Sequence, residues 1–265
     1  MHGAFLYMKK AKKAKARKTR KPLIICAVVI AAAVLLGILA IMFKNGDIKI
    51  NTPSKKKYPV RGVDVSRYQG DINWPELAAQ DISFAYIKAT EGSTHVDPKF
   101  THNYMHAQKT QLRVGAYHFF SFDSGAESQA ANFTGQVMPY ERMLPPAVDI
   151  EYYGNYSNSS HPDVSTVKAE LGRLLELLYD HYGIRPVIYA TQATYKTYIR
   201  GNFDDYDIWI RDKYFTPGDN IVNWHFWQYS DKGVLKGYSG VEKYIDLDVF
   251  RGTAEEFEQY GFPEK

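Results

Sequence analysis

Hydrophobic positions divide the chain into two parts with different patterns. From Leu23 to Phe43 runs an unbroken stretch of 21 uncharged, mostly apolar residues. A helix of that length crosses a hydrocarbon core about 30 Å thick. From Tyr58 onward, short apolar runs alternate with amphipathic segments, which is typical of an α/β domain. The pattern therefore predicts one transmembrane helix followed by a folded α/β domain.

Within that domain, the apolar runs predict eight strands and the amphipathic segments predict six helices. The strands are expected at Gly62–Val65, Phe84–Lys88, Arg113–Phe119, Ala147–Ile150, Val187–Tyr189, Asp207–Arg211, His225–Tyr229 and Tyr244–Val249. The helices are expected at Trp74–Gln80, Pro98–Gln111, Ser124–Met138, Asp163–Tyr182, Gln192–Ile199 and Thr253–Tyr260. Eight strands, most of them separated by helices, fit a compact β/α barrel, which builds its active site at the C-terminal ends of its strands.

A basic run precedes the apolar stretch. Residues 9–21, KKAKKAKARKTRK, hold nine Lys/Arg and no acid. A nuclear or nucleic-acid signal is one alternative, but the apolar stretch follows at once. The positive-inside rule then places the N-terminus in the cytoplasm and the domain outside a single-pass cell membrane anchor. A cleaved signal peptide is the other alternative. The apolar stretch exceeds the usual length for one, and no small-x-small cleavage site stands just beyond it.

These features predict four segments. Residues 1–22 form a basic cytoplasmic tail, residues 23–43 the membrane anchor, residues 44–59 a linker and residues 60–265 the folded domain. The linker is polar, rich in lysine and without periodicity, so as a flexible coil it spans roughly 20–24 Å. We therefore expect the domain to lie close to the membrane surface.

Charge is segregated between these segments. Residues 1–57 carry a net charge of +13, whereas residues 58–265 carry 19 Lys/Arg and 28 Asp/Glu, a net charge of −9. An acidic domain argues against nucleic acid as a ligand, because such ligands select basic surfaces. The one cysteine is Cys26, in the apolar stretch, so the domain has no disulfide or thiol chemistry.

The candidate chemistry begins at Pro145-Pro-Ala-Val-Asp-Ile-Glu. Alternate residues of a strand face the same side, so Asp149 and Glu151 are expected on one face, roughly 6.6 Å apart along the strand. Two like charges at that distance push one pKa up, which keeps a protonated acid available near neutral pH. The alternative is a strand end with two solvated acids.

Two further acids stand at strand positions that a barrel would bring close. Asp64 closes the first predicted strand and Asp246 lies in the last, and these strands are neighbours in a closed barrel. Converging buried carboxylates imply function, a metal or a cationic partner. A hard cation held by Asp149, Glu151, Asp246 and Asp248 is an alternative. Asp246 and Asp248 share a face only with each other, and no loop has calcium-binding spacing. We therefore expect no metal and no cofactor.

Several motifs, in order, resemble those of family 25 glycoside hydrolases, the lysozyme-type muramidases. The resemblance covers about residues 58–252. It rests on Arg61-Gly-Val-Asp-Val-Ser-Arg-Tyr-Gln-Gly with Ile72-Asn-Trp, Ala85-Tyr-Ile-Lys-Ala-Thr-Glu-Gly, Gly115-Ala-Tyr-His-Phe-Phe, Val148-Asp-Ile-Glu, Phe226-Trp-Gln-Tyr and Ile245-Asp-Leu-Asp-Val-Phe.

The resemblance implies a flattened, irregular (β/α) TIM-like barrel that cleaves the β-1,4 bond between N-acetylmuramic acid and N-acetylglucosamine in peptidoglycan. It makes Glu151 the general acid/base. Asp149 would stabilise the developing positive charge, by positioning the 2-acetamido group of the substrate. Asp64 and Asp246 would line the same pocket. The partners implied are peptidoglycan glycan strands, and we expect a monomer.

Other residues are assigned around these acids. The expected sugar contacts are Tyr117, Tyr189, Trp209 and Gln228, whereas Lys88 and Glu91 are either pocket residues or an ion pair. His118, on a buried strand, is expected to be a core histidine. A separation of ~6.6 Å exceeds the 5–5.5 Å of a direct nucleophile and acid, so inversion and substrate assistance both stay open, and the resemblance favours the second. A catalytically inactive wall-binding module and a membrane scaffold are the alternative functions.

Overall fold

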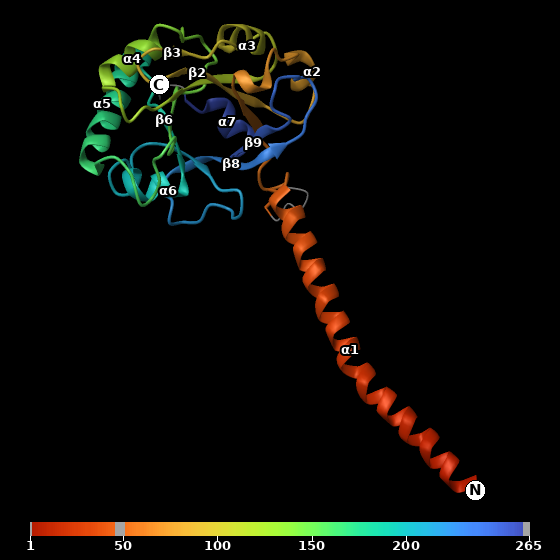
Figure 1. Cartoon of the computed structure of the whole chain (residues 1–265). Coiled ribbons are helices and arrows are strands. Elements are labelled where there is room, and N and C mark those ends of the chain that lie inside the picture. Colours follow the sequence, from red (N-terminus) through yellow and green to blue (C-terminus); the bar gives the residue numbers. More distant parts are fainter. Residues whose placement is uncertain (1, 46–50, 262–265) are drawn as a thin grey trace. The chain divides into compact units, whose positions relative to one another are not determined.

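The computed structural model describes residues 2–45 and 51–261, which fall into two units divided between Ile50 and Asn51. The first unit is one helix, α1 (His2–Asn45) (Figure 1). Within it, Lys21–Phe43 is long and apolar enough to cross a membrane, and side chains 21–43 are exposed throughout. The predicted anchor is therefore helical.

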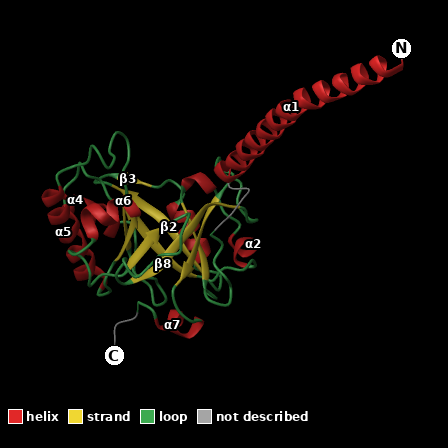
Figure 2. Cartoon of the chain, turned by 90° about the horizontal axis from the view of Figure 1, so that it is seen from below, coloured by secondary structure: helices red, strands yellow, loops and turns green. Residues whose placement is uncertain are grey.

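The second unit is a closed barrel (Figure 2). Hydrogen bonding orders its strands β1-β9-β8-β7-β6-β5-β4-β2-β3, and β1 also pairs with β2, which closes eight of them into a ring. β9 is antiparallel to β8 and β1, and the other neighbours in the ring are parallel. The strands are β1 (Arg61–Val65), β2 (Phe84–Glu91), β3 (His95–Val96), β4 (Arg113–Phe119), β5 (Ala147–Ile150), β6 (Val187–Thr191), β7 (Ile208–Arg211), β8 (Trp224–Gly233) and β9 (Ile245–Phe250).

Helices surround the barrel, and α4 and α5 lie side by side on one flank (Figure 1). The longest, α5, has a cap at each end: the Asp163 side chain accepts a hydrogen bond from Thr166 N, and Gly183 ends the helix at φ +66°. The helical segments of this unit are η1 (Arg67–Gln69), α2 (Trp74–Ala78), α3 (Phe100–Ala107), α4 (Ala126–Thr134), α5 (Val164–Tyr182), α6 (Gln192–Thr194), η2 (Tyr195–Ile199) and α7 (Ala254–Gln259).

Two hydrophobic cores follow from the alternation of strand side chains. On β7, Ile208 and Ile210 pack outward under the helices, whereas Trp209 packs into the barrel. The inner core is largely aromatic, and small residues make room for it. A Cβ on Gly115 would lie 2.3 Å from the Tyr86 ring, so this strand position requires glycine.

This architecture confirms the predicted barrel, with differences in detail. Because β9 runs antiparallel, Asp246 enters the mouth from the beginning of its strand and not from a C-terminal end. The predicted strand at His225–Tyr229 continues to Gly233, the predicted helix Pro98–Gln111 is shorter, and the hairpin strand β3 was not predicted.

The N-terminal edge of the domain also differs from the predicted linker at residues 44–59. Tyr58 is 4% exposed and packs against Trp224 and Trp227, with ring centroids 6.3 and 5.7 Å away. The Asn51 side chain donates a hydrogen bond to the Asp212 carbonyl. The compact unit thus begins at Asn51, and residues 46–50 of the predicted linker lie outside the described residues.

Candidate active site

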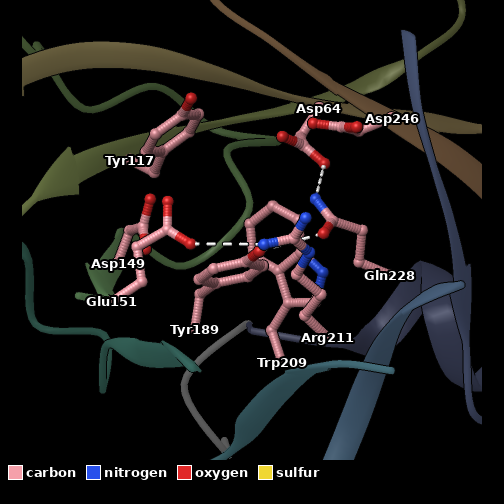
Figure 3. A pocket seen from close by; sticks show the side chains of 9 residues that line it. All are labelled: Asp64, Tyr117, Asp149, Glu151, Tyr189, Trp209, Arg211, Gln228 and Asp246. Carbon is pink, nitrogen blue, oxygen red and sulfur yellow. Dashed lines mark hydrogen bonds and ion pairs between the residues drawn. The ribbon is translucent and has the colours of Figure 1, made fainter. Parts of the chain in front are cut away.

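A pocket of about 150 Å³ opens at the mouth of the barrel (Figure 3). Eight of the ten residues predicted for the site line it, and one residue that was not predicted joins them. The lining residues are Asp64, Tyr117, Asp149, Glu151, Tyr189, Trp209, Arg211, Gln228 and Asp246.

Strand register brings these side chains together. Asp149 on β5 is the register partner of Tyr189 on β6, which in turn is the partner of Trp209 on β7. On the other side of the mouth, Asp64 on β1 is the register partner of Asp246 on β9. The acids therefore come from strands far apart in sequence and meet because the sheet closes.

Asp149 and Glu151 form a coupled acid pair on one side of the pocket. Glu151 comes directly after the last residue of β5, and both side chains line the pocket, as the alternation predicts. Burial raises the pKa of Asp149 well above its ordinary value, and the Glu151 charge raises it further. Burial also raises the pKa of Glu151, against the lowering effect of Arg211 and Lys88. The pair therefore favours holding one proton between two carboxyl groups.

One carboxylate oxygen of Asp149 is a buried hydrogen-bond acceptor without a donor among the described residues. This oxygen is Oδ1, and it accepts no hydrogen bond from any residue within 2–45 or 51–261. A buried acceptor without a donor is costly unless a ligand supplies one. This oxygen is therefore available to a donor on a bound substrate.

Arg211 is the pocket residue that the sequence analysis missed. Its Nη1 lies 3.6 Å from Glu151 Oε2, and its Nη2 donates to Asp231 Oδ2 at 3.1 Å. Lys213 Nζ also contacts Asp231 Oδ2, at 2.6 Å. Arg211 closes the predicted strand Asp207–Arg211 two residues after Trp209, so alternation places it on the same inward face. That spacing was the available signal.

The opposite side of the pocket is a hydrogen-bonded chain. Tyr189 Oη donates to Gln228 Oε1 at 2.9 Å, and Gln228 Nε2 donates to Asp64 Oδ2 at 2.7 Å. Burial raises the pKa of Asp64 well above its ordinary value, and so does the neighbouring Asp248 charge. Asp246 behaves similarly, because burial and the Asp64 charge both raise its pKa.

Lys88 and Glu91 lie outside this pocket. They form an ion pair, with Lys88 Nζ 2.7 Å from Glu91 Oε2. Lys88 also lies over the Phe119 ring, 4.5 Å from its centroid. The Lys88 charge still reaches the acid pair, since it lowers the pKa of both Asp149 and Glu151.

His118 is a core histidine, as predicted. It is buried, with Nδ1 2.7 Å from Thr90 Oγ1 and Nε2 3.0 Å from Gln129 Oε1. Burial lowers its pKa to about 4, so the ring is neutral near neutral pH. With both ring nitrogens engaged, it does not serve the pocket.

The pocket continues into a second hollow of about 270 Å³, which shares Asp64, Tyr117 and Asp246. Its outer wall adds Tyr68, Gln69, Asp231, Glu242 and Tyr244. We call this hollow the side cleft.

Backbone hydrogen bonds fix the wall of the side cleft. Gly240 N donates to Gln69 O and Glu242 N donates to Tyr68 O, each at 3.0 Å. A Cβ on Gly240 would lie 2.1 Å from Tyr68 O, so only glycine permits this contact between the two loops. These contacts join the loop after β1 to the loop after β8. Tyr68, on the first of these loops, is therefore held in place at the wall of the side cleft.

Within residues 2–45 and 51–261, no cluster of His, Cys, Asp or Glu has an arrangement that could hold a metal ion. The coupled carboxyl groups of Asp149 and Glu151, beside Arg211, can transfer protons. Such a pair suits cleavage of a glycosidic bond, which needs one protonated and one ionised carboxyl group around an oxocarbenium-like transition state.

Known proteins are similar to this chain in sequence and in fold. A family 25 glycosyl hydrolase from Bacillus anthracis is 48% identical, with a TM-score of 0.75 over 80% of this chain and 97% of that one. Lysozyme M1 of Streptomyces globisporus is 32% identical over 74% of this chain and 69% of its own. The uncharacterised YegX protein of Escherichia coli K12 is 34% identical over 77% of this chain and 74% of its own. The family model for glycosyl hydrolases family 25 matches residues 63–238. The chain therefore belongs to glycosyl hydrolases family 25 and is a glycoside hydrolase.

Proposed function

We propose that this protein is a membrane-anchored muramidase. It hydrolyses the β-1,4 bond between N-acetylmuramic acid and N-acetylglucosamine in peptidoglycan, with Glu151 as general acid/base and Asp149 as the stabilising carboxylate. The observation that carries the proposal is the coupled Asp149–Glu151 pair in a pocket at the mouth of a family 25 barrel. The lysozyme named among its relatives supports the choice of substrate.

In the first step, Glu151 donates its proton to the glycosidic oxygen as the bond to the leaving sugar breaks. Burial raises the pKa of both carboxyl groups, so the pair shares a proton that Glu151 can deliver to the leaving sugar. Positive charge develops on the anomeric carbon, and the Asp149 carboxylate lowers its energy. Glu151, now ionised, then takes a proton from the water that attacks the anomeric carbon, which restores the starting state.

The orphaned acceptor on Asp149 favours substrate assistance. Its buried Oδ1 has no donor among the described residues, and the N–H of a 2-acetamido group is a donor of the required kind. A hydrogen bond from that N–H would orient the acetamido oxygen toward the anomeric carbon. This route retains the anomeric configuration, whereas direct attack by water inverts it. Proton NMR of freshly released product distinguishes the two outcomes.

Binding of the glycan strand involves the rest of the pocket. Tyr117, Tyr189 and Trp209 present aromatic groups, and Gln228 and Asp246 present polar ones. The side cleft then receives a neighbouring sugar of the same strand. Lys88 acts from outside the pocket, through its charge and its ion pair with Glu91.

The anchor places this activity at the cell membrane. The apolar segment of α1 follows a basic run, and the N-terminal part of the chain is strongly cationic, so the N-terminus lies in the cytoplasm and the barrel outside. The chain then stays with membranes after carbonate extraction. Recovery of a shortened soluble form alone would contradict the anchor.

The central experiment is digestion of purified peptidoglycan with residues 51–265, followed by mass spectrometry of the fragments. We expect new reducing ends on N-acetylmuramic acid. Glu151→Gln should retain the fold and wall binding but lose at least ~100-fold in turnover, because a positioned acid contributes 10²–10⁴-fold. Exposed Glu258→Gln is the matched control and should keep full activity. Wall binding by the wild type without any new reducing ends would favour the inactive binding module instead.

A further inference from the structure

Beneath the pocket, Asp248 on β9 is completely buried and does not line the pocket. Its Oδ1 accepts a hydrogen bond from Trp209 Nε1 at 2.8 Å. Its Oδ2 is buried too, and no donor reaches it from the part of the chain that the structure describes. An ionised aspartate in this place would leave one of its two carboxylate oxygens unpaired, which is unfavourable in a buried site.

The neighbours of Asp248 act in both directions: the Asp246 charge disfavours its ionised form, whereas the hydrogen bonds with Trp209 and Asp64 favour it. Its carboxyl group lies within hydrogen-bond reach of Asp64, which is also within reach of Asp246. The charged group facing this cluster from β7 is Arg211, which acts on Asp64 and Asp246. From β2 the cluster is faced by the Tyr86 hydroxyl, which donates to the Pro145 carbonyl. Three neighbouring carboxyl groups cannot all ionise readily in a buried place.

Among the three, Asp248 is the most buried. Asp64 is 7% exposed and receives a hydrogen bond from Gln228 Nε2, which stabilises its ionised form, whereas Asp246 is partly exposed at the mouth. A proton on Asp248 Oδ2 gives that oxygen a partner, since it can donate to the adjacent Asp64 carboxyl group. The same proton removes one negative charge from the cluster.

We propose that Asp248 is a positioning residue that works as a neutral acid, accepting from Trp209 through Oδ1 and donating from Oδ2 to the carboxylate of Asp64. Asp64 is thereby held between two donors, Asp248 and Gln228, and Trp209 is held by the same side chain. One buried acid thus orients two residues that line the pocket. The catalytic part of this inference rests on the proposed muramidase function, whereas the protonation state does not.

Two substitutions in the 51–265 protein test the inference. In Asp248→Asn, the side-chain carbonyl accepts from Trp209 and the amide N–H donates to Asp64, so both hydrogen bonds survive. In Asp248→Leu, the size is similar and both hydrogen bonds are lost. We expect Asp248→Asn to keep kcat within about threefold of wild type with an unchanged pH profile. Asp248→Leu should lose at least tenfold in kcat/KM, because a misplacement of 1 Å can cost about 100-fold.

Infrared difference spectroscopy supplies a readout that does not depend on activity or on the stability of the leucine variant. At neutral pH the wild type should show one protonated-carboxyl carbonyl stretch more than Asp248→Asn, in addition to the band of the Asp149–Glu151 pair that both proteins share. The same band without a difference between the two proteins would overturn the inference. So would a folded Asp248→Asn that loses 100-fold, since that result requires an ionised carboxylate. If Asp248→Leu has the rate and pH profile of the wild type, Asp248 does not position the pocket residues.

If the wild type does not cleave peptidoglycan, the muramidase proposal fails while the infrared result still decides the protonation state of Asp248.

Discussion

Arg211 approaches Glu151 without forming a close hydrogen bond, since Arg211 Nη1 and Glu151 Oε2 are 3.6 Å apart. Arg211 Nη2, in contrast, donates to Asp231 Oδ2 at 3.1 Å. The arginine is thus held mainly by Asp231 and acts on Glu151 through its charge. That charge lowers the pKa of Glu151 and of Asp149, against the larger effect of burial. Arg211 therefore lowers the pH range over which the acid pair ionises.

The first prediction concerns this charge. Arg211→Gln should raise the pKa of both members of the pair, so both limbs of the bell-shaped profile of kcat/KM move to higher pH. The limbs belong to the coupled pair and not to either residue alone. Lys213→Gln is the matched control, because Lys213 also binds Asp231 but does not contact Glu151. A profile of Arg211→Gln that stays in place or moves to lower pH would rule out this tuning.

The second prediction concerns stability. Burial raises the pKa of Asp149 in the folded state above its unfolded value of about 3.9, so folding favours the protonated form. This contribution is fully present below about pH 4 and is lost as the pH rises through the raised pKa. Asp149→Asn has no such loss. Its Tm should exceed that of the wild type by an amount that widens from pH 4 to pH 8, at about 2–4 °C per kcal/mol.

Thermal unfolding monitored by circular dichroism across that pH range gives the measurement. Exposed Asp180→Asn on α5 controls for the loss of one negative charge. Asp149→Asn should at the same time lose most of its turnover, so the gain in stability comes at the expense of activity. A difference in Tm that narrows as the pH rises would contradict the proposed cost of the buried carboxylate.

The third prediction concerns the side cleft. Tyr68 is 49% exposed, and Arg67 lies over one side of its ring, 5.0 Å from the centroid. Tyr68→Ala should raise KM for long glycan strands about fivefold, the equivalent of about 1 kcal/mol for an aromatic contact, with little change in kcat. Tyr179→Ala on α5 is the control, since Tyr179 is equally exposed and lines neither the pocket nor the side cleft. Equal KM values for the two variants would exclude Tyr68 from binding.

The fourth prediction concerns the edge of the domain. A protein that begins at Arg61 lacks Tyr58, which packs on Trp224 and Trp227, and lacks the Pro53 carbonyl that accepts from Arg61. Removal of a buried aromatic side chain costs about 3–5 kcal/mol. Urea unfolding should therefore show residues 61–265 to be less stable than residues 51–265 by at least that order. Both proteins lack cysteine, so reducing agent should affect neither. Equal urea midpoints for the two proteins would show that residues 51–60 belong to the linker and not to the folded domain.

Much of the pocket could be predicted because local rules determine it. Period-two alternation puts Asp149 and Glu151 on one face, and the closure of eight strands brings Asp64 to Asp246. Arg211 was missed although the same alternation applies to it. A charged residue at a strand end resembles a solvated one until its partners, Glu151 and Asp231, are known.

Other features depend on contacts between distant segments, which leave no local signal. The hydrogen bond between Gly240 and Gln69 that shapes the side cleft is of this kind. The direction of β9 was not accessible either, because no helix was predicted before His225–Tyr229 or before Tyr244–Val249, yet β8 is parallel to β7 and β9 is antiparallel to β8. The burial of Asp248 could not be predicted from the sequence. Alternation indicates which face of the strand its side chain lies on, but not how deeply that side chain is buried.

The closure of the barrel also determines when the site can exist. β1 must pair with β9 as well as with β2, and β9 carries both Asp246 and Asp248. A chain is made from its N-terminus, so the strand that completes the acid cluster is the last strand of the barrel to be synthesised. Pairing of segments this distant is slow compared with local folding. A growing chain that still lacks β9 therefore has neither a closed ring nor Asp246 in its pocket, and it gains both together when the last strand is in place.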